Sequence, residues 1–172
     1  MGVKNMKNNI INLVLKRMAE GYKEQMPHYE KMLELAHKQT AIIGKEDVDT
    51  EELLETINDR QNLIENLESM NEGIVELKKE IKSTLEIEQF NISSIKECLS
   101  GKGVDALSIA LAELASVLVE IKEVDNKNEK RMGFILQDTR EKLNGIKNVK
   151  KADKAYQTAP VANGGIFVDY TK

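Results

Sequence analysis

Few residues of this chain have the types and spacing that chemistry at a metal ion requires. Glu34 and His37 form a Glu-x-x-His pair, one half of the ligand set of a carboxylate-bridged di-iron site in a helical bundle. That chemistry needs a second such pair and two further glutamates, and no Glu lies three residues before His28, the other histidine of the chain. We therefore expect neither a metal nor a cofactor.

Other motifs that resemble catalytic or ion-binding sequences fail at a defining position. Cys98 has no histidine near it in the sequence, so no base is available to activate its thiol. The stretch SGKGVD lacks the spacing of a phosphate-binding loop. DVDTE resembles the start of a calcium loop, but Glu52 stands where the sharp turn needs glycine and Asn58 where a bidentate Glu belongs. We predict a protein that binds and does not catalyse.

The composition favours a helical protein that contacts neither nucleic acid nor the membrane interior. Charged residues make up 31% of the 172 residues and aromatic residues 4%, with 2 prolines and no tryptophan, a profile typical of long amphipathic helices. The net charge of -4 gives no basic footprint for nucleic acid. Because there is no signal-peptide pattern, no apolar run of about 18 residues for membrane insertion and only a single cysteine, we expect a cytoplasmic protein.

Apolar residues recur at helical spacing over most of the chain and predict three long amphipathic helices. Their expected ranges are about 8–43, 50–99 and 105–148. The alternating steps of 3 and 4 are coiled-coil-like and predict shallow crossings of about 20°. The expected fold is all-α, an elongated antiparallel three-helix bundle in residues 1–155, followed by a flexible, mostly non-helical tail at 156–172.

The helix boundaries rest on a few local signals. Pro27 removes a backbone donor inside the first helix, so a kink or a restart is expected near residues 24–27. Gly44 favours the end of that helix, and Asp49 with Glu52 forms a variant of the capping box at the start of the second. The stretch NISS and a glycine are the weak points of the second helix.

Two polar residues interrupt the apolar stripe of the last helix. Asp125 and Asn128 occupy positions that the 3,4 spacing assigns to Leu, Ile or Met. If they are buried, Asp125 needs a Lys, an Arg or a hydrogen-bond donor opposite, because an unpaired buried carboxylate is costly. One interpretation is a polar layer that fixes the register of the bundle. The other is that the bundle opens here and a partner helix occupies the space.

Three stretches resemble a known family. YEKMLELAHKQTAIIGKEDVDTEELLETINDRQNLIENLESM has a helix, a short Gly/Asp turn and a second helix rich in Leu and Glu. IKEVDNKNEKRMGFIL is polar and then apolar. LNGIKNVKKADKAYQTAPVANGGIFVDYTK has a Lys-rich segment, a Tyr, a loose linker and a glycine-plus-aromatic-plus-Asp motif. The chain resembles flagellar type III export chaperones of the FlgN and FliT class, FlgN-like in its length and N-terminal helices and FliT-like in its tail.

The resemblance implies a cytoplasmic chaperone that binds the amphipathic helical C-terminus of a late flagellar subunit and delivers it to the flagellar export apparatus. The implied clients are the hook-filament junction proteins or the filament cap protein. Such a helix needs an apolar groove with an adaptable lining, which Met supplies. We expect this groove behind the Asp125 and Asn128 break, unless the same residues are ordinary bundle core. Its expected lining is Met132, Phe134, Ile135, Leu136, Leu143 and Ile146.

The end of the chain, GGIFVDYTK, is a β-prone cluster behind two glycines. One interpretation is an inert, disordered tail on a finished bundle. The other is a clamp in which Ile166, Phe167 and Tyr170 cover the groove until a client displaces them, since an inert tail does not need exposed apolar residues. We also assign Tyr156, in the Lys-rich segment, to partner binding.

Two other functions remain open at this point. A structural or adaptor coiled coil would self-associate, for example as a homodimer, through the same seams. A metal-dependent helical-bundle enzyme is the weakest alternative, because the second Glu-x-x-His is missing.

Overall fold

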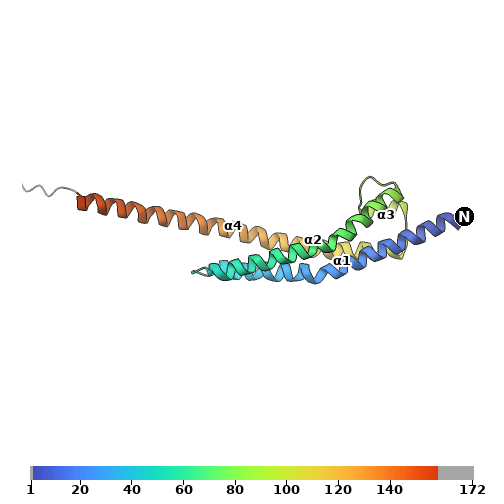
Figure 1. Cartoon of the computed structure of the whole chain (residues 1–172), viewed down its shortest axis with the longest axis horizontal. Helices are drawn as coiled ribbons and strands as arrows, with labels where there is room; N and C mark the ends of the chain where they lie inside the picture. Colours follow the sequence, from blue (N-terminus) through green and yellow to red (C-terminus); the bar gives the residue numbers. More distant parts are fainter. Residues whose placement is uncertain (1, 159–172) are drawn as a thin grey trace, which may run out of the picture. The chain divides into compact units, whose positions relative to one another are not determined.

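A computed structural model of the chain describes residues 2–158, which form four α-helices (Figure 1). They are α1 (Gly2–Ile43), α2 (Thr50–Leu85), α3 (Ile92–Cys98) and α4 (Lys102–Thr158). No strand occurs within these residues, so the all-α prediction is confirmed. The contacts divide the chain into two units, Met1–Arg131 and Met132–Lys172, and α4 contributes to both.

Helix α1 is longer than predicted and is not broken at Pro27. It starts at Gly2, and Pro27 lies inside it. Of the predicted kink or restart, the restart is therefore wrong. Pro27 faces solvent, so the backbone donor that it lacks is on the exposed side of the helix. The buried side chains of Tyr22 and Met32, which precede and follow it, hold both halves of α1 in the core.

The turn between α1 and α2 forms at the residues that the sequence predicts, although Gly44 does not adopt the expected left-handed conformation and the Glu52 carboxylate pairs with Lys38 and Lys45. Gly44 donates its N–H to Thr40 O at the end of α1. Asp49 is the N-cap of α2, and its carboxylate accepts the N–H groups of Glu51 and Glu52 at 3.1 and 3.0 Å. These bonds satisfy two of the donors that a helix N-terminus leaves unpaired. The start of the second helix near residue 50 is confirmed.

The single second helix predicted at 50–99 is wrong, because the chain leaves it after Leu85. Glu86 adopts a left-handed backbone conformation with φ 56° and ends α2. Asn91 then starts α3 as its N-cap, accepting the Ser94 N–H at 2.8 Å. Asn91 belongs to the stretch NISS, which the sequence marks as weak. The sequence did not indicate a helix end at Glu86, because helix ends are normally marked by Gly or Pro.

Aromatic contacts hold the segment between α2 and α3 against the rest of the first unit. The Lys78 ammonium lies 5.7 Å from the centre of the Tyr22 ring and 5.8 Å from that of Phe90, which is within cation–π distance. Ile87 and Phe90 pack, partly buried, on the main core. The chain therefore breaks where it can turn two apolar side chains inward.

The start of α4 is fixed by Asn12 of α1. The Asn12 side chain donates to Ser100 O and accepts the Gly103 N–H at 2.9 Å. The backbones of α1 and α4 approach so closely here that a Cβ on Gly103 would lie 2.0 Å from Asn12 O. Gly101 has φ 143°, a conformation that favours glycine. The glycines of SGKGVD thus allow a close helix junction, and α4 begins at Lys102, slightly before the predicted residue 105.

The predicted end of the last helix near residue 148 is also wrong, since α4 continues to Thr158. No glycine or proline occurs between Gly145 and Pro160. The lysines and alanines of this stretch are strong helix formers. Residues 156–158, assigned to the tail by the sequence, are helical, and the rest of the predicted tail lies outside the described residues.

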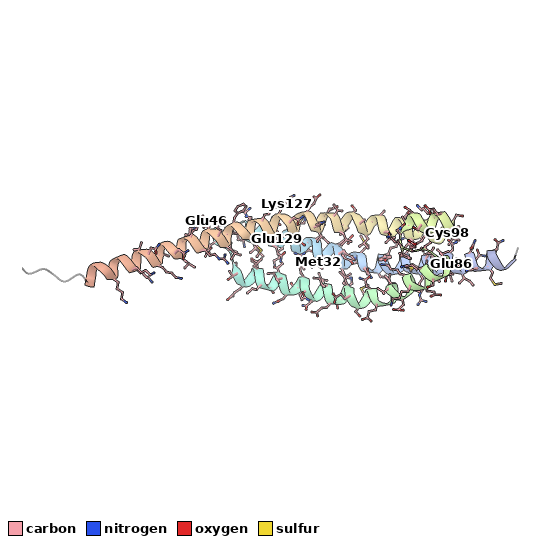
Figure 2. The ribbon with its side chains drawn as sticks, turned by 90° about the horizontal axis from the view of Figure 1, so that it is seen from above. Met32, Glu46, Glu86, Cys98, Lys127 and Glu129 are labelled. Carbon is pink, nitrogen blue, oxygen red and sulfur yellow. The ribbon has the colours of Figure 1, made fainter. Side chains whose placement is uncertain are left out.

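The main core of the first unit takes side chains from all four helices. Its members include Leu15 and Met18 of α1, Ile81 of α2, Ile95 of α3 and Leu107 of α4. A smaller cluster joins Met32, Leu67 and Ile121. In Figure 2 Met32 lies within this unit, with Glu46 toward one end of it and Cys98 toward the other.

Side-chain hydrogen bonds give the helix directions in the first unit. Gln25 bonds Asn71, and Gln39 bonds Arg60, so α1 and α2 run antiparallel, side by side as in Figure 1. Between α1 and α4 the bonds join Asn12 to Gly103 and Ala36 to Asn128, so these two helices run parallel.

Candidate protein-binding site

The carboxylate of Asp125 is paired with Arg60 of α2. Arg60 Nη1 and Nη2 donate to the two Asp125 oxygens at 2.7 and 2.6 Å, the bidentate geometry that makes such pairs strong. Arg60 Nη1 also donates to Gln39 Oε1 of α1 at 2.7 Å. The Arg60 side chain is 17% exposed and that of Asp125 37%. One polar cluster therefore joins α1, α2 and α4.

The sequence predicts a Lys, an Arg or a hydrogen-bond donor opposite a buried Asp125, but it does not identify which residue this is. A signal was present, because Arg60, Leu67, Ile74 and Ile81 are spaced by seven residues, and the last three are buried. An arginine in register with a core stripe indicates a buried or half-buried partner.

Asn128 is buried between α4 and α1 at 5% exposure. Its Nδ2 donates to Ala36 O at 2.9 Å, and its Oδ1 accepts the Thr40 hydroxyl at 2.8 Å. One turn further along α4, Arg131 donates to Ile43 O and Gly44 O, both at 3.2 Å. These bonds satisfy carbonyls at the C-terminus of α1 that have no partner within that helix.

Asp125 and Asn128 thus have partners inside the first unit, and these contacts support the polar-layer interpretation. A direct role of either residue in partner binding stays a prediction. The layer joins three helices at the end of the first unit, next to the residue at which the second unit begins.

The residues predicted to line a groove all lie on α4 in the second unit. Leu136, Leu143 and Ile146 are exposed, the last two at 51% and 53%, and Met132 and Ile135 are partly exposed. At about 100° of rotation per residue, these five side chains lie on one face of the helix. The second unit therefore presents an apolar face on a single helix.

Phe134 does not belong to this face. It is 74% exposed, and the same helical rotation places it on the opposite side of α4 from Met132 and Leu143. Sequence reasoning missed Val149, an exposed residue at the edge of the apolar face. The 3,4 spacing did not include it, although its position three residues after Ile146 was a signal.

The other predicted partner-binding residues cannot be placed with these. Ile166, Phe167 and Tyr170 lie outside the described residues, and Tyr156 is within α4, but its side chain is not among those described.

The residues weighed for chemistry are far from a catalytic arrangement. Glu34 is paired with Lys31 at 2.8 Å on an exposed face of α1, and His37 is exposed. Cys98, the last residue of α3, is exposed as well. Across residues 2–158 no group of three or more His, Cys, Asp and Glu side chains could hold a metal ion.

A membrane span is not found in the described part of the chain, where every helix is too short or too polar to cross a bilayer.

The comparison with protein families decides what kind of protein this is. The family model described as FlgN protein matches residues 6–161, almost the whole chain. The chain belongs to the FlgN family. The predicted resemblance to flagellar export chaperones of this class is confirmed. No curated protein and no solved structure matches the chain.

FlgN membership gives the chain a general role as a flagellar export chaperone. The matched range includes the polar layer and the apolar face of α4. FlgN proteins are a chaperone family and not an enzyme family, and they bind flagellar export substrates. The face on α4 is therefore the candidate site for such a substrate.

Proposed function

We propose that this protein holds the amphipathic helical C-terminus of a late flagellar subunit on the apolar face of α4 and delivers the subunit to the flagellar type III export apparatus. The observation that carries the proposal is the exposure of Leu136, Leu143 and Ile146 on one side of the helix. An apolar stripe that is exposed on a single helix is a surface that a second amphipathic helix can bury.

Membership of the FlgN family supports one client kind over the other. Within the class that the sequence resembles, FlgN-type chaperones take hook-filament junction proteins and FliT-type chaperones take the filament cap. Because the matching family is FlgN, we propose the junction proteins as clients.

The setting of this activity is part of the same proposal. We place it in the cytoplasm, without catalysis, nucleic-acid binding or membrane insertion. We also propose that α1, α2 and the first part of α4 form the antiparallel, coiled-coil-like three-helix bundle predicted from the sequence. The shared core and the polar layer support this arrangement.

Peptide binding tests the proposal. C-terminal peptides of the junction proteins should bind the full chain at concentrations on the order of tens of micromolar or below. Ile146→Ser should weaken binding about tenfold, because burial of an isoleucine contributes about 1.5–3 kcal/mol. Ile109→Ser is the matched control, since Ile109 lies on α4 in the first unit and is 56% exposed.

Two results would overturn the proposal. One is the absence of binding to every junction and cap peptide at these concentrations. The other is equal loss of binding in the Ile146 and Ile109 variants. A dimer that forms with increasing concentration in sedimentation and ignores the peptides would instead favour a self-associating adaptor.

A further inference from the structure

The face of α4 that carries the apolar side chains becomes basic beyond Ile146. Lys147, Lys150 and Lys151 are exposed and in the same helix. At about 100° per residue, Lys150 lies in line with Met132, Lys147 lies at the edge of the same face beside Leu136, and Lys151 lies on the adjoining flank of the helix. One face therefore has an apolar half followed by a basic half.

This segment differs in charge from the rest of the chain. Residues 144–158 contain four lysines and one carboxylate, that of Asp153, whereas the whole chain has a net charge of -4. A cationic segment in an acidic protein selects for an anionic partner group.

Among the described residues, Lys147, Lys150 and Lys151 lack the pairing with a carboxylate seen elsewhere in the helices. Lys142 pairs with Asp138 at 2.7 Å, and Lys79 pairs with Glu76 at 2.8 Å. The residues three and four positions from Lys147 are a leucine, an asparagine and two lysines. Lysines at these spacings repel one another. An external carboxylate would relieve this repulsion.

The arrangement along the helix distinguishes a protein partner from a membrane. A helix that lies on a bilayer carries its lysines on the polar side, around the apolar stripe. Here Lys150 follows the apolar residues along the axis in the middle of the same face, so a helix lying flat would press it into the acyl region. A second helix with a matching axial pattern meets both halves at once.

We propose that the partner of this face is an amphipathic helix with an apolar half and an acidic half, whose carboxylates contact Lys147, Lys150 and Lys151. This inference rests on the proposed function, that α4 holds a client helix, and it adds the chemistry by which the client is selected. The apolar half supplies contact area, and the acidic half fixes the register and direction of the client on α4.

Designed peptides test the charge requirement. Each has about 20 residues, enough to span the face at 1.5 Å per residue, with Leu in one half. The other half carries Glu, at either the N-terminal or the C-terminal end, or Gln in a matched neutral version. At least one Glu peptide should bind the full chain about tenfold more tightly than its Gln version, and salt should reduce the difference.

Charge-reversal variants assign the effect to residues. Lys147→Glu with Lys150→Glu should abolish the advantage of the Glu peptide. Lys127→Glu with Lys130→Glu is the control, because these lysines have the same spacing on α4, are exposed and lie in the first unit. Lys147→Gln with Lys150→Gln repeats the test without new acidic groups, and circular dichroism checks that each variant keeps its helical content.

The outcomes separate this inference from the proposed function. If Glu and Gln peptides bind equally, or if the Lys147 and Lys150 variants keep the preference for Glu, the proposal of an acidic half in the partner helix is wrong. The proposal that α4 binds the client through its apolar face is not affected by this result. Tighter binding to vesicles with anionic lipid than to any peptide would overturn it in favour of a membrane. If no peptide binds and Ile146→Ser changes nothing for the junction peptides, the proposed function itself fails.

Discussion

At the scale of single residues, the polar layer decides how the first unit is held together. Asp125 reaches Arg60, and Arg60 reaches Gln39, so one guanidinium joins three helices. Asn128 adds a buried bond to a backbone carbonyl of α1. Buried polar groups are costly unless they are hydrogen-bonded, so they favour the one helix alignment in which each group has its partner. The layer therefore favours a single register of α4 against α1 and α2.

Arg60→Ala should destabilise the protein by about 1–3 kcal/mol, because it leaves the carboxylate of Asp125 half-buried without its partner. Lys79→Ala removes an exposed pair with Glu76 and should cost less than about 1 kcal/mol. Urea denaturation of the two variants measures the difference. Equal losses would show that the Arg60 pair contributes no more than a surface pair.

Part of this layer could be predicted from the sequence. The interruption of the stripe at Asp125 and Asn128 was visible from spacing alone, as was the need for a cation or a hydrogen-bond donor opposite a buried Asp125. Arg60 was not identified, because choosing it requires the alignment of α2 against α4, which depends on the turn geometry of two junctions. The partners of Asn128 could not be predicted at all, since one of them is the backbone carbonyl of Ala36.

At the scale of elements, α4 has two different parts. Its first part carries buried side chains such as Leu107, which has 0% exposure, while Leu143 in the second part is 51% exposed. Side chains of the first part stabilise the fold, and we assign those of the second to binding.

Matched leucine substitutions test this division. Leu107→Ala should cost about 2–5 kcal/mol of the free energy of unfolding, because it creates a cavity in the core. Leu143→Ala should cost less than about 1 kcal/mol and still weaken binding of the junction peptides. Thermal and urea unfolding measure the stability losses of the two variants, and peptide titration measures the affinity of the Leu143 variant. A large stability loss in the Leu143 variant would mean that this residue is core.

The helix boundaries show where local sequence signals suffice. The Asp49 cap was predictable, because an N-cap residue acts through its own nearest donors. The break at Glu86 was not, since it depends on the packing of Ile87 and Phe90 against a core built by distant residues. The end of α4 was misread because a basic, polar stretch resembles a linker in composition, although its helix propensity is high.

At the scale of the whole molecule, the family match joins these parts into one account of a chaperone. The sequence resemblance already suggested the class, since its motifs extend over most of the chain. Most residues of the face that we assign to the client could be predicted, although Phe134 was wrongly included and Val149 was missed. That these residues lie on a single helix in a unit of its own could not be predicted, because the division of α4 between two units depends on contacts between residues far apart in the sequence.

The role of the C-terminal tail is tested by removing residues 160–172. If Ile166, Phe167 and Tyr170 cover the apolar face, truncation should raise the affinity for junction peptides about threefold or more, because a larger fraction of molecules is then competent to bind. It should also increase the binding of a dye that reports apolar surface. Serine at these three positions in the full chain is the control for chain length. Unchanged affinity and dye signal would leave the tail as an inert extension.

Hydrogen exchange with and without a saturating junction-protein peptide tests the central claim most directly. Binding stabilises the segment that it contacts, so its amides exchange more slowly. The account predicts slower exchange over residues 132–154 of α4, with little change in the first unit. Slower exchange confined to α1 and α2, with α4 beyond Arg131 unchanged, would contradict it.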